Sequence, residues 1–100
     1  MGFLSDLFER KKTVARGREL AMAFSKRLSK EKITDEKRVA TEYDLLKADA
    51  VAYQRRANLG VIGKSQLVNS FQWTLIAEGY PEEFSKEIGG QLAVTLAATR

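Results

Sequence analysis

Hydrophobic residues recur at three- and four-residue spacing along most of the chain, which is the period of an α-helix that buries one face. The clearest stripe belongs to a helix predicted to start at Thr34 as its N-cap, with Asp35 and Glu36 in its first turn. Its members are separated alternately by four and three residues: Val39, Tyr43, Leu46, Ala50, Tyr53 and Ala57. Strand-like alternation does not persist, so the pattern predicts an all-α protein, a compact bundle of about four helices.

The first predicted helix covers roughly residues 4–30, with a break expected near Lys11 and Lys12, where the apolar pattern lapses. Residues 1–12 are therefore interpreted as an amphipathic N-terminal arm or as the first turns of the helix, and residues 13–100 as a single helical domain. Beyond the break, the residues predicted to form a packing face are Val14, Gly17, Leu20, Ala21, Phe24 and Leu28.

The third predicted helix, about residues 65–78, has apolar residues on two opposite faces. One face carries Leu67, Val68, Phe71 and Leu75, and the other carries Trp73, Ile76, Ala77 and Tyr80. Because one neighbour cannot cover both faces, this helix is either central in the monomer or contributes one face to a contact with another subunit.

The fourth predicted helix begins near Pro81, and acidic residues follow in its first turn. Gly89 and Gly90 leave three alternatives open: close approach of another backbone along Gly89, Ala93 and Ala97, a kink or helix break, or a strand within residues 91–99.

Composition narrows the chemistry that the chain can perform. The 100 residues are 44% hydrophobic and include neither cysteine nor histidine, which removes disulfides, thiolate chemistry, the commonest metal ligand and the usual general base. Adjacent acids such as Glu82 and Glu83 are ordinary for a helix start. We therefore expect no enzyme, no catalytic residues, no cofactor, no metal and no small-molecule substrate. The lack of a long apolar run or a signal-like start predicts a cytoplasmic location.

Positive charge is concentrated in the first third of the chain, although the net charge is only +4. Residues 1–32 contain nine Lys or Arg against four acids. A helix with such residues can neutralise phosphates, so one alternative function is nucleic-acid binding. The candidate contacts are Arg10, Lys11, Lys12, Arg16 and Arg18.

Gly63, Lys64 and Ser65 resemble the closing residues of a phosphate-binding P-loop. The leading glycine of that motif falls at position 58, which is Asn, and the residues before it predict a helix rather than a buried strand. We therefore interpret residues 58–65 as a connector between helices, with Ser65 near the next N-cap.

Four large apolar residues near the start of the chain stand where chain ends usually fray. A small core gains stability from association, and aromatic and aliphatic anchors dominate interface energy, so our principal hypothesis is a binding protein that forms a homodimer. Its predicted interface residues are Phe3, Leu4, Leu7, Phe8, Trp73, Ile76 and Tyr80. A second alternative is a membrane surface, since residues 1–12 resemble the short amphipathic anchors of peripheral bacterial proteins.

Overall fold

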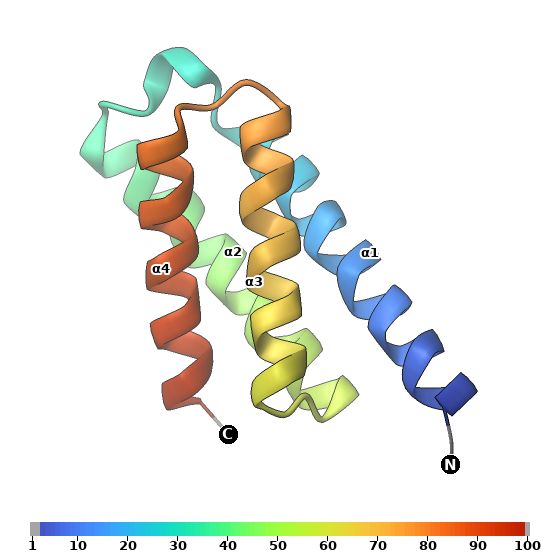
Figure 1. Ribbon diagram of the computed structural model, residues 1–100. Coiled ribbons are helices and arrows are strands. Elements are labelled where there is room, and N and C mark those ends of the chain that lie inside the picture. The colour runs from blue at the N-terminus through green and yellow to red at the C-terminus, as the bar shows by residue number, and fades with distance from the viewer. Residues whose placement is uncertain (1–2, 100) are drawn as a thin grey trace.

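Four α-helices and one short 3₁₀ turn make up residues 3–99, the part of the chain described by the computed structural model (Figure 1). The elements are α1 (Phe3–Arg27), η1 (Lys30–Lys32), α2 (Glu36–Ala57), α3 (Val61–Ala77) and α4 (Glu82–Ala98). These residues contain no strand, so the all-α bundle is confirmed and the strand alternative for residues 91–99 is wrong.

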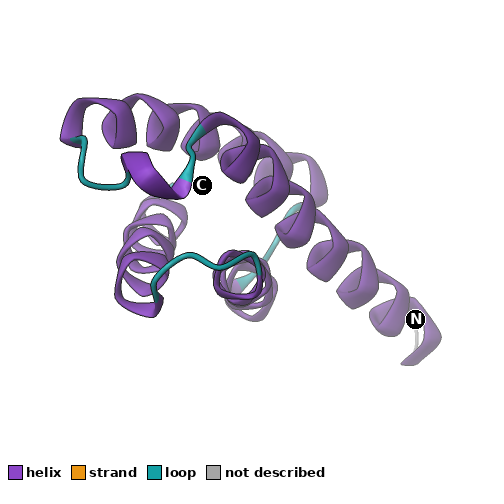
Figure 2. Cartoon of the chain, turned by 90° about the horizontal axis from the view of Figure 1, so that it is seen from above, coloured by secondary structure: helices purple, strands orange, loops and turns teal. Residues whose placement is uncertain are grey.

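Helix α1 packs most extensively along α3, and α3 in turn packs along α4, while α2 makes smaller contacts with α1 and α4. The two views show α3 and α4 side by side and the beginning of α1 extending past the other helices (Figures 1 and 2). The molecule is elongated, with extents of 46 × 26 × 19 Å. A helix of 25 residues rises about 37 Å, so α1 accounts for much of the long dimension.

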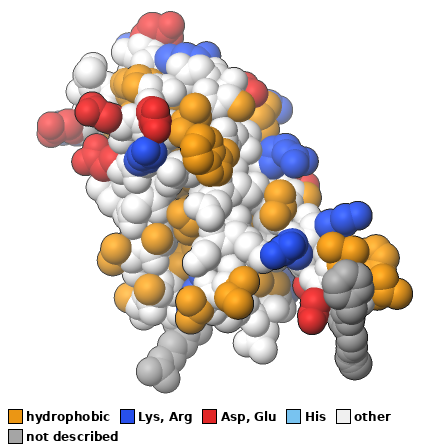
Figure 3. All heavy atoms as spheres, viewed as in Figure 1, with side chains coloured by type: hydrophobic (Ala, Val, Ile, Leu, Met, Phe, Trp, Pro, Cys, Tyr) orange, Lys and Arg blue, Asp and Glu red, His pale blue; other side chains and the backbone are white. Residues whose placement is uncertain are grey.

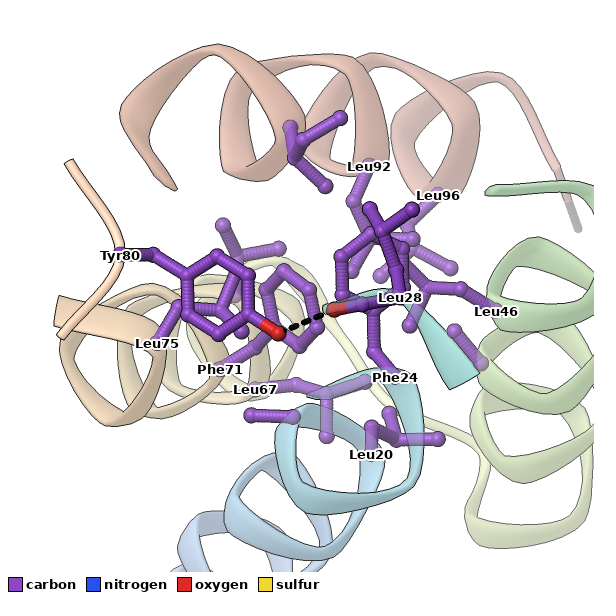
Figure 4. Close-up of a cluster of buried hydrophobic side chains, with 14 residues drawn as sticks. Leu20, Phe24, Leu28, Leu46, Leu67, Phe71, Leu75, Tyr80, Leu92 and Leu96 are labelled. Carbon is purple, nitrogen blue, oxygen red and sulfur yellow. Dashed lines mark hydrogen bonds between the residues drawn. The ribbon is translucent and has the colours of Figure 1, made fainter. Parts of the chain in front are cut away.

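The core lies where α1, α3 and α4 meet, with Leu46 and Ala50 of α2 closing one side (Figure 4). Phe24 and Phe71 are completely buried and meet edge to face, with their ring centroids 5.9 Å apart. Tyr80 follows α3 and turns inward, where its hydroxyl donates a hydrogen bond to the carbonyl oxygen of Leu28.

Gly17 marks the closest approach of α1 to α3. A Cβ at this position would lie 2.7 Å from both the carbonyl oxygen of Leu67 and the Cβ of Ser70. The Ser70 hydroxyl donates to the carbonyl oxygen of Val14, one turn earlier on α1. The absence of a side chain at Gly17 therefore lets the two helices pack at nearly backbone distance.

Gly89 is buried against Gln72 of α3, which supports the close-packing alternative for this glycine. Helix α4 continues through Gly89 and Gly90 as one element, so the alternative of a helix break is wrong. Ala93 and Ala97 are exposed, and the close approach therefore does not extend along the whole small-residue strip.

Helix α2 begins one residue later than predicted. Asp35, not Thr34, is the N-cap, and its carboxylate accepts a hydrogen bond from the backbone N–H of Arg38 at 3.2 Å. Glu42, one turn after Arg38, is buried. It forms ion pairs with Arg27 of α1 at 2.7 Å and with Arg38 at 3.6 Å. These contacts fix the corner between α1 and α2.

Helix α3 begins at Val61, four residues earlier than predicted, because Gly60 is the N-cap and Gly63 is tolerated in the first turns. Only residues 58–60 separate α2 from α3, with Asn58 in the left-handed conformation that ends α2. Ser65 is therefore inside the helix, and the predicted N-cap role for Ser65 is wrong.

Helix α1 runs through Lys11 and Lys12 without interruption, so the predicted break is also wrong. Both lysines are exposed and are good helix formers, and an exposed helical turn needs no apolar residue. Residues 3–12 of the predicted arm thus form the beginning of α1.

Candidate interaction surface

The first turns of α1 present apolar side chains to solvent. We call residues 4–12 the arm. Leu4 and Phe8 lie one helical turn apart on the same side and are 66% and 60% exposed. Helix α1 extends past the bundle here, so no helix of the same chain covers them (Figure 2). The side chain of Phe3, also predicted to be at the interface, lies outside the described residues.

The opposite side of the arm faces a shallow hollow at the corner between α2 and α3. Asp6, Leu7, Glu9 and Arg10 line this hollow from α1. Residues contributed by the facing corner include Leu59, Ile62, Gly63 and Gln66. The two acids of the arm therefore lie on the hollow side, whereas Leu4 and Phe8 do not line the hollow.

Val61 and Ile62 form a second exposed apolar pair, at the start of α3, with 81% and 73% of their surfaces exposed. Hydrophobic side chains gather at this end of the molecule, and acidic side chains gather toward the end where α4 begins (Figure 3). The sequence prediction missed this pair because it assigned both residues to a connector. The Gly60 N-cap signal could have placed them on a helix.

The second predicted contact face, on α3, is smaller than expected. Trp73 is 58% exposed beside Arg18 and Met22 of α1, while Ile76 is half-buried. The prediction that Tyr80 joins this face is wrong, because α3 ends at Ala77 and Tyr80 is buried in the core. Gly79, with a φ of 101°, turns the chain inward at this point.

The five basic residues predicted to contact nucleic acid do not form one stripe. Arg10 lines the hollow with Asp6 and Glu9, and Lys12 lies 3.9 Å from Glu9. Arg16 is half-buried, pairs with Glu19 at 2.9 Å and places its guanidinium over the Tyr53 ring. Lys11 and Arg18 are seven residues apart and share the outer side of α1.

Several acidic side chains of the described residues pair with basic neighbours. Glu82 pairs with Lys86 at 2.8 Å, and this hydrogen bond lowers the pKa of the Glu82 carboxyl. Within residues 3–99, no three acidic side chains converge on a common point that could hold a metal ion. In the same residues, no helix has the length and apolar character needed to cross a membrane.

Comparison of the chain with protein-family models, with curated proteins and with solved structures gives no match. The surface geometry is therefore the basis for assigning a role.

Proposed function

We propose that this protein is a non-enzymatic binding protein that associates with further copies of itself through the arm. The observation that carries the proposal is the exposure of Leu4 and Phe8 on an ordered helix. Full burial of a side chain of this kind contributes about 1.5–3 kcal/mol. Every additional copy carries the same two residues, so this burial free energy is gained at each contact between copies. A cytoplasmic location, expected from the sequence, belongs to the same proposal.

The test is the solution mass of the full chain, measured by light scattering after size exclusion over a range of concentrations. We expect assemblies larger than a monomer for the natural sequence and monomers for the Leu4→Ser, Phe8→Ser double variant. Leu45→Ser is the matched control, because Leu45 is an exposed leucine on α2 far along the chain from the arm. A natural sequence that stays monomeric at all concentrations would rule out self-association.

An anionic membrane surface is the second candidate, and the arm supplies a specific reason for it. The outward side of the arm carries Leu4, Phe8 and Lys11, while Asp6 and Glu9 line the hollow on the other side. The acids thus do not oppose contact with anionic lipid on the outward side. Sedimentation with vesicles that contain an anionic phospholipid tests this candidate. Retention that Leu4→Ser, Phe8→Ser abolishes would support it, and the absence of binding would exclude it.

A further inference from the structure

A groove lies between α4 and the first half of α2, and neither α1 nor α3 contributes to its lining. Its floor is apolar and includes Val39, Tyr43 and Phe84, all half-buried. Helix α2 makes only limited contact with α4, which leaves this floor accessible. An apolar groove between two helices is a common seat for the apolar side of a third helix.

The charged residues that line the groove are all acidic. They are Glu36 and Asp44 on α2 and Glu87 on α4, and each is exposed. No Lys or Arg of the described residues lines the groove, although the chain as a whole has a net charge of +4. The groove therefore complements a helix that has apolar residues on one side and basic residues next to them.

The arm of the same protein has this chemistry. Leu4, Phe8, Lys11 and Lys12 are all exposed and stand at positions i, i+4, i+7 and i+8 of one helix. The rise from Leu4 to Lys12 is about 12 Å at 1.5 Å per residue, and the rise from Glu36 to Asp44 along α2 is the same. The arm from Leu4 to Lys12 thus spans the same rise as the part of α2 between the two acidic residues of the groove, Glu36 and Asp44.

We propose that the arm of one copy docks in the α2–α4 groove of another copy. Leu4 and Phe8 then cover the apolar floor, and Lys11 and Lys12 lie beside the acidic residues of the rim. This assignment rests on the self-association proposed above and names the surface that receives the arm. Arm and groove are different surfaces, so two copies can exchange their arms in a two-fold dimer, or the contact can repeat in a ring or an open chain.

Reversal of charge on each side separately tests the docking. The reversed arm is Lys11→Glu, Lys12→Glu, and the reversed groove is Asp44→Lys, Glu87→Lys. Each variant alone places like charges against each other, and we expect association at least about tenfold weaker than that of the natural sequence. All four residues are exposed, so we expect both variants to fold, which circular dichroism checks.

A mixture of the two variants gives the sharpest result. In an equimolar mixture, the acidic arm meets the basic groove, and the basic arm of the second variant meets the acidic groove of the first. Every contact is again complementary, so we expect the mixture to regain the mass of the natural assembly. If both variants stay monomeric when mixed, the arm does not dock in this groove.

The control for charge alone is Asp49→Lys, Glu78→Lys, which makes the same change at exposed residues outside the groove and should leave the assembly intact. If the natural sequence and the Asp44→Lys, Glu87→Lys variant associate equally well, the protein does self-associate, but the arm does not dock in this groove. Should the reversed groove fail to fold, Asp44→Asn, Glu87→Gln replaces it. An unchanged association constant in that neutral pair would likewise overturn the assignment.

Discussion

The two parts of α1 belong to one uninterrupted helix but have opposite relations to the rest of the molecule. From Thr13 to Arg27, the residues that face the bundle are buried, and Phe24 lies at the centre of the core. From Leu4 to Lys12, no residue is fully buried, and two of the three large apolar side chains, Leu4 and Phe8, face solvent.

This difference separates stability from binding within a single element. Side chains that are already buried contribute to the free energy of unfolding of one chain, whereas exposed apolar side chains contribute only when another molecule covers them. Substitutions in the arm should therefore change association with little effect on stability, and substitutions after Thr13 should do the reverse.

Two phenylalanines of α1 give the largest expected contrast. Phe24→Ala should lower the free energy of unfolding by about 3–5 kcal/mol, because it leaves a cavity in the core. Phe8→Ala should change it by less than about 0.5 kcal/mol at concentrations where the chain is monomeric. Urea unfolding followed by circular dichroism measures both. Equal losses for the two variants would show that the arm is part of the core.

Two glycines provide the next contrast. Gly17→Ala should lower the free energy of unfolding by up to about 2 kcal/mol, because overpacking against the backbone of α3 exceeds the gain in helix propensity. Gly90→Ala should raise the free energy of unfolding by about 0.5–1 kcal/mol, since a Cβ at this position of α4 would meet open space. Thermal unfolding of both variants checks the signs. A stabilised Gly17→Ala would contradict the close approach of α1 and α3.

The contribution of Tyr80 to stability at the C-terminal end of α1 should depend on pH. Burial raises the pKa of Tyr80 above the ordinary value of about 10, and the hydroxyl donates hydrogen bonds to the carbonyl oxygens of Leu28 and Ser25. Tyr80→Phe should lower the free energy of unfolding by about 0.5–1.5 kcal/mol at neutral pH.

The raised pKa fixes the sign of the pH effect. The contribution of the neutral phenol to stability is complete below about pH 10 and is lost as the pH rises through the folded pKa. The stability difference between the natural sequence and Tyr80→Phe should therefore shrink above about pH 10. Urea unfolding at pH 7, 9 and 11 measures this difference. A difference that stays constant would contradict a buried phenol.

Trp73 is expected to give the smallest effect. Trp73→Ser removes a largely exposed side chain, so the free energy of unfolding should change by less than about 0.5 kcal/mol. The mass of the assembly should also stay unchanged, because the proposed contact uses the arm and the groove. If Trp73→Ser is monomeric but as stable as the natural sequence, the contact between copies lies on α3 instead of the arm.

The sequence was most informative where one side of a helix carries a long apolar stripe. The stripe from Val39 to Ala57 correctly identified the packing side of α2. Ile88, Leu92 and Leu96, which recur every four residues, lie on the buried side of α4. In such helices the spacing of the apolar residues alone shows which side is buried, because the helical period places residues three and four apart on the same side.

Prediction failed where tertiary structure outweighs the local pattern. Tyr80 continues the helical spacing of Trp73 and Ile76, but the turn at Gly79 places it in the core. The groove between α2 and α4 combines residues 45 positions apart in sequence, such as Val39 and Phe84, and no local period links them. The prediction grouped Leu7 with Leu4 and Phe8, but Leu7 is half-buried and lines the hollow, because which residues of the arm face the hollow depends on the path of α1 past α3.

The most direct test of the account is the solution mass of the intact chain beside a chain that lacks residues 2–12, by light scattering after size exclusion, with circular dichroism on both. The account predicts assemblies for the intact chain, and a folded monomer with nearly the same thermal midpoint for the shortened one. An equal number of subunits in both, or a shortened chain that no longer folds, would contradict the claim that the arm serves association rather than stability.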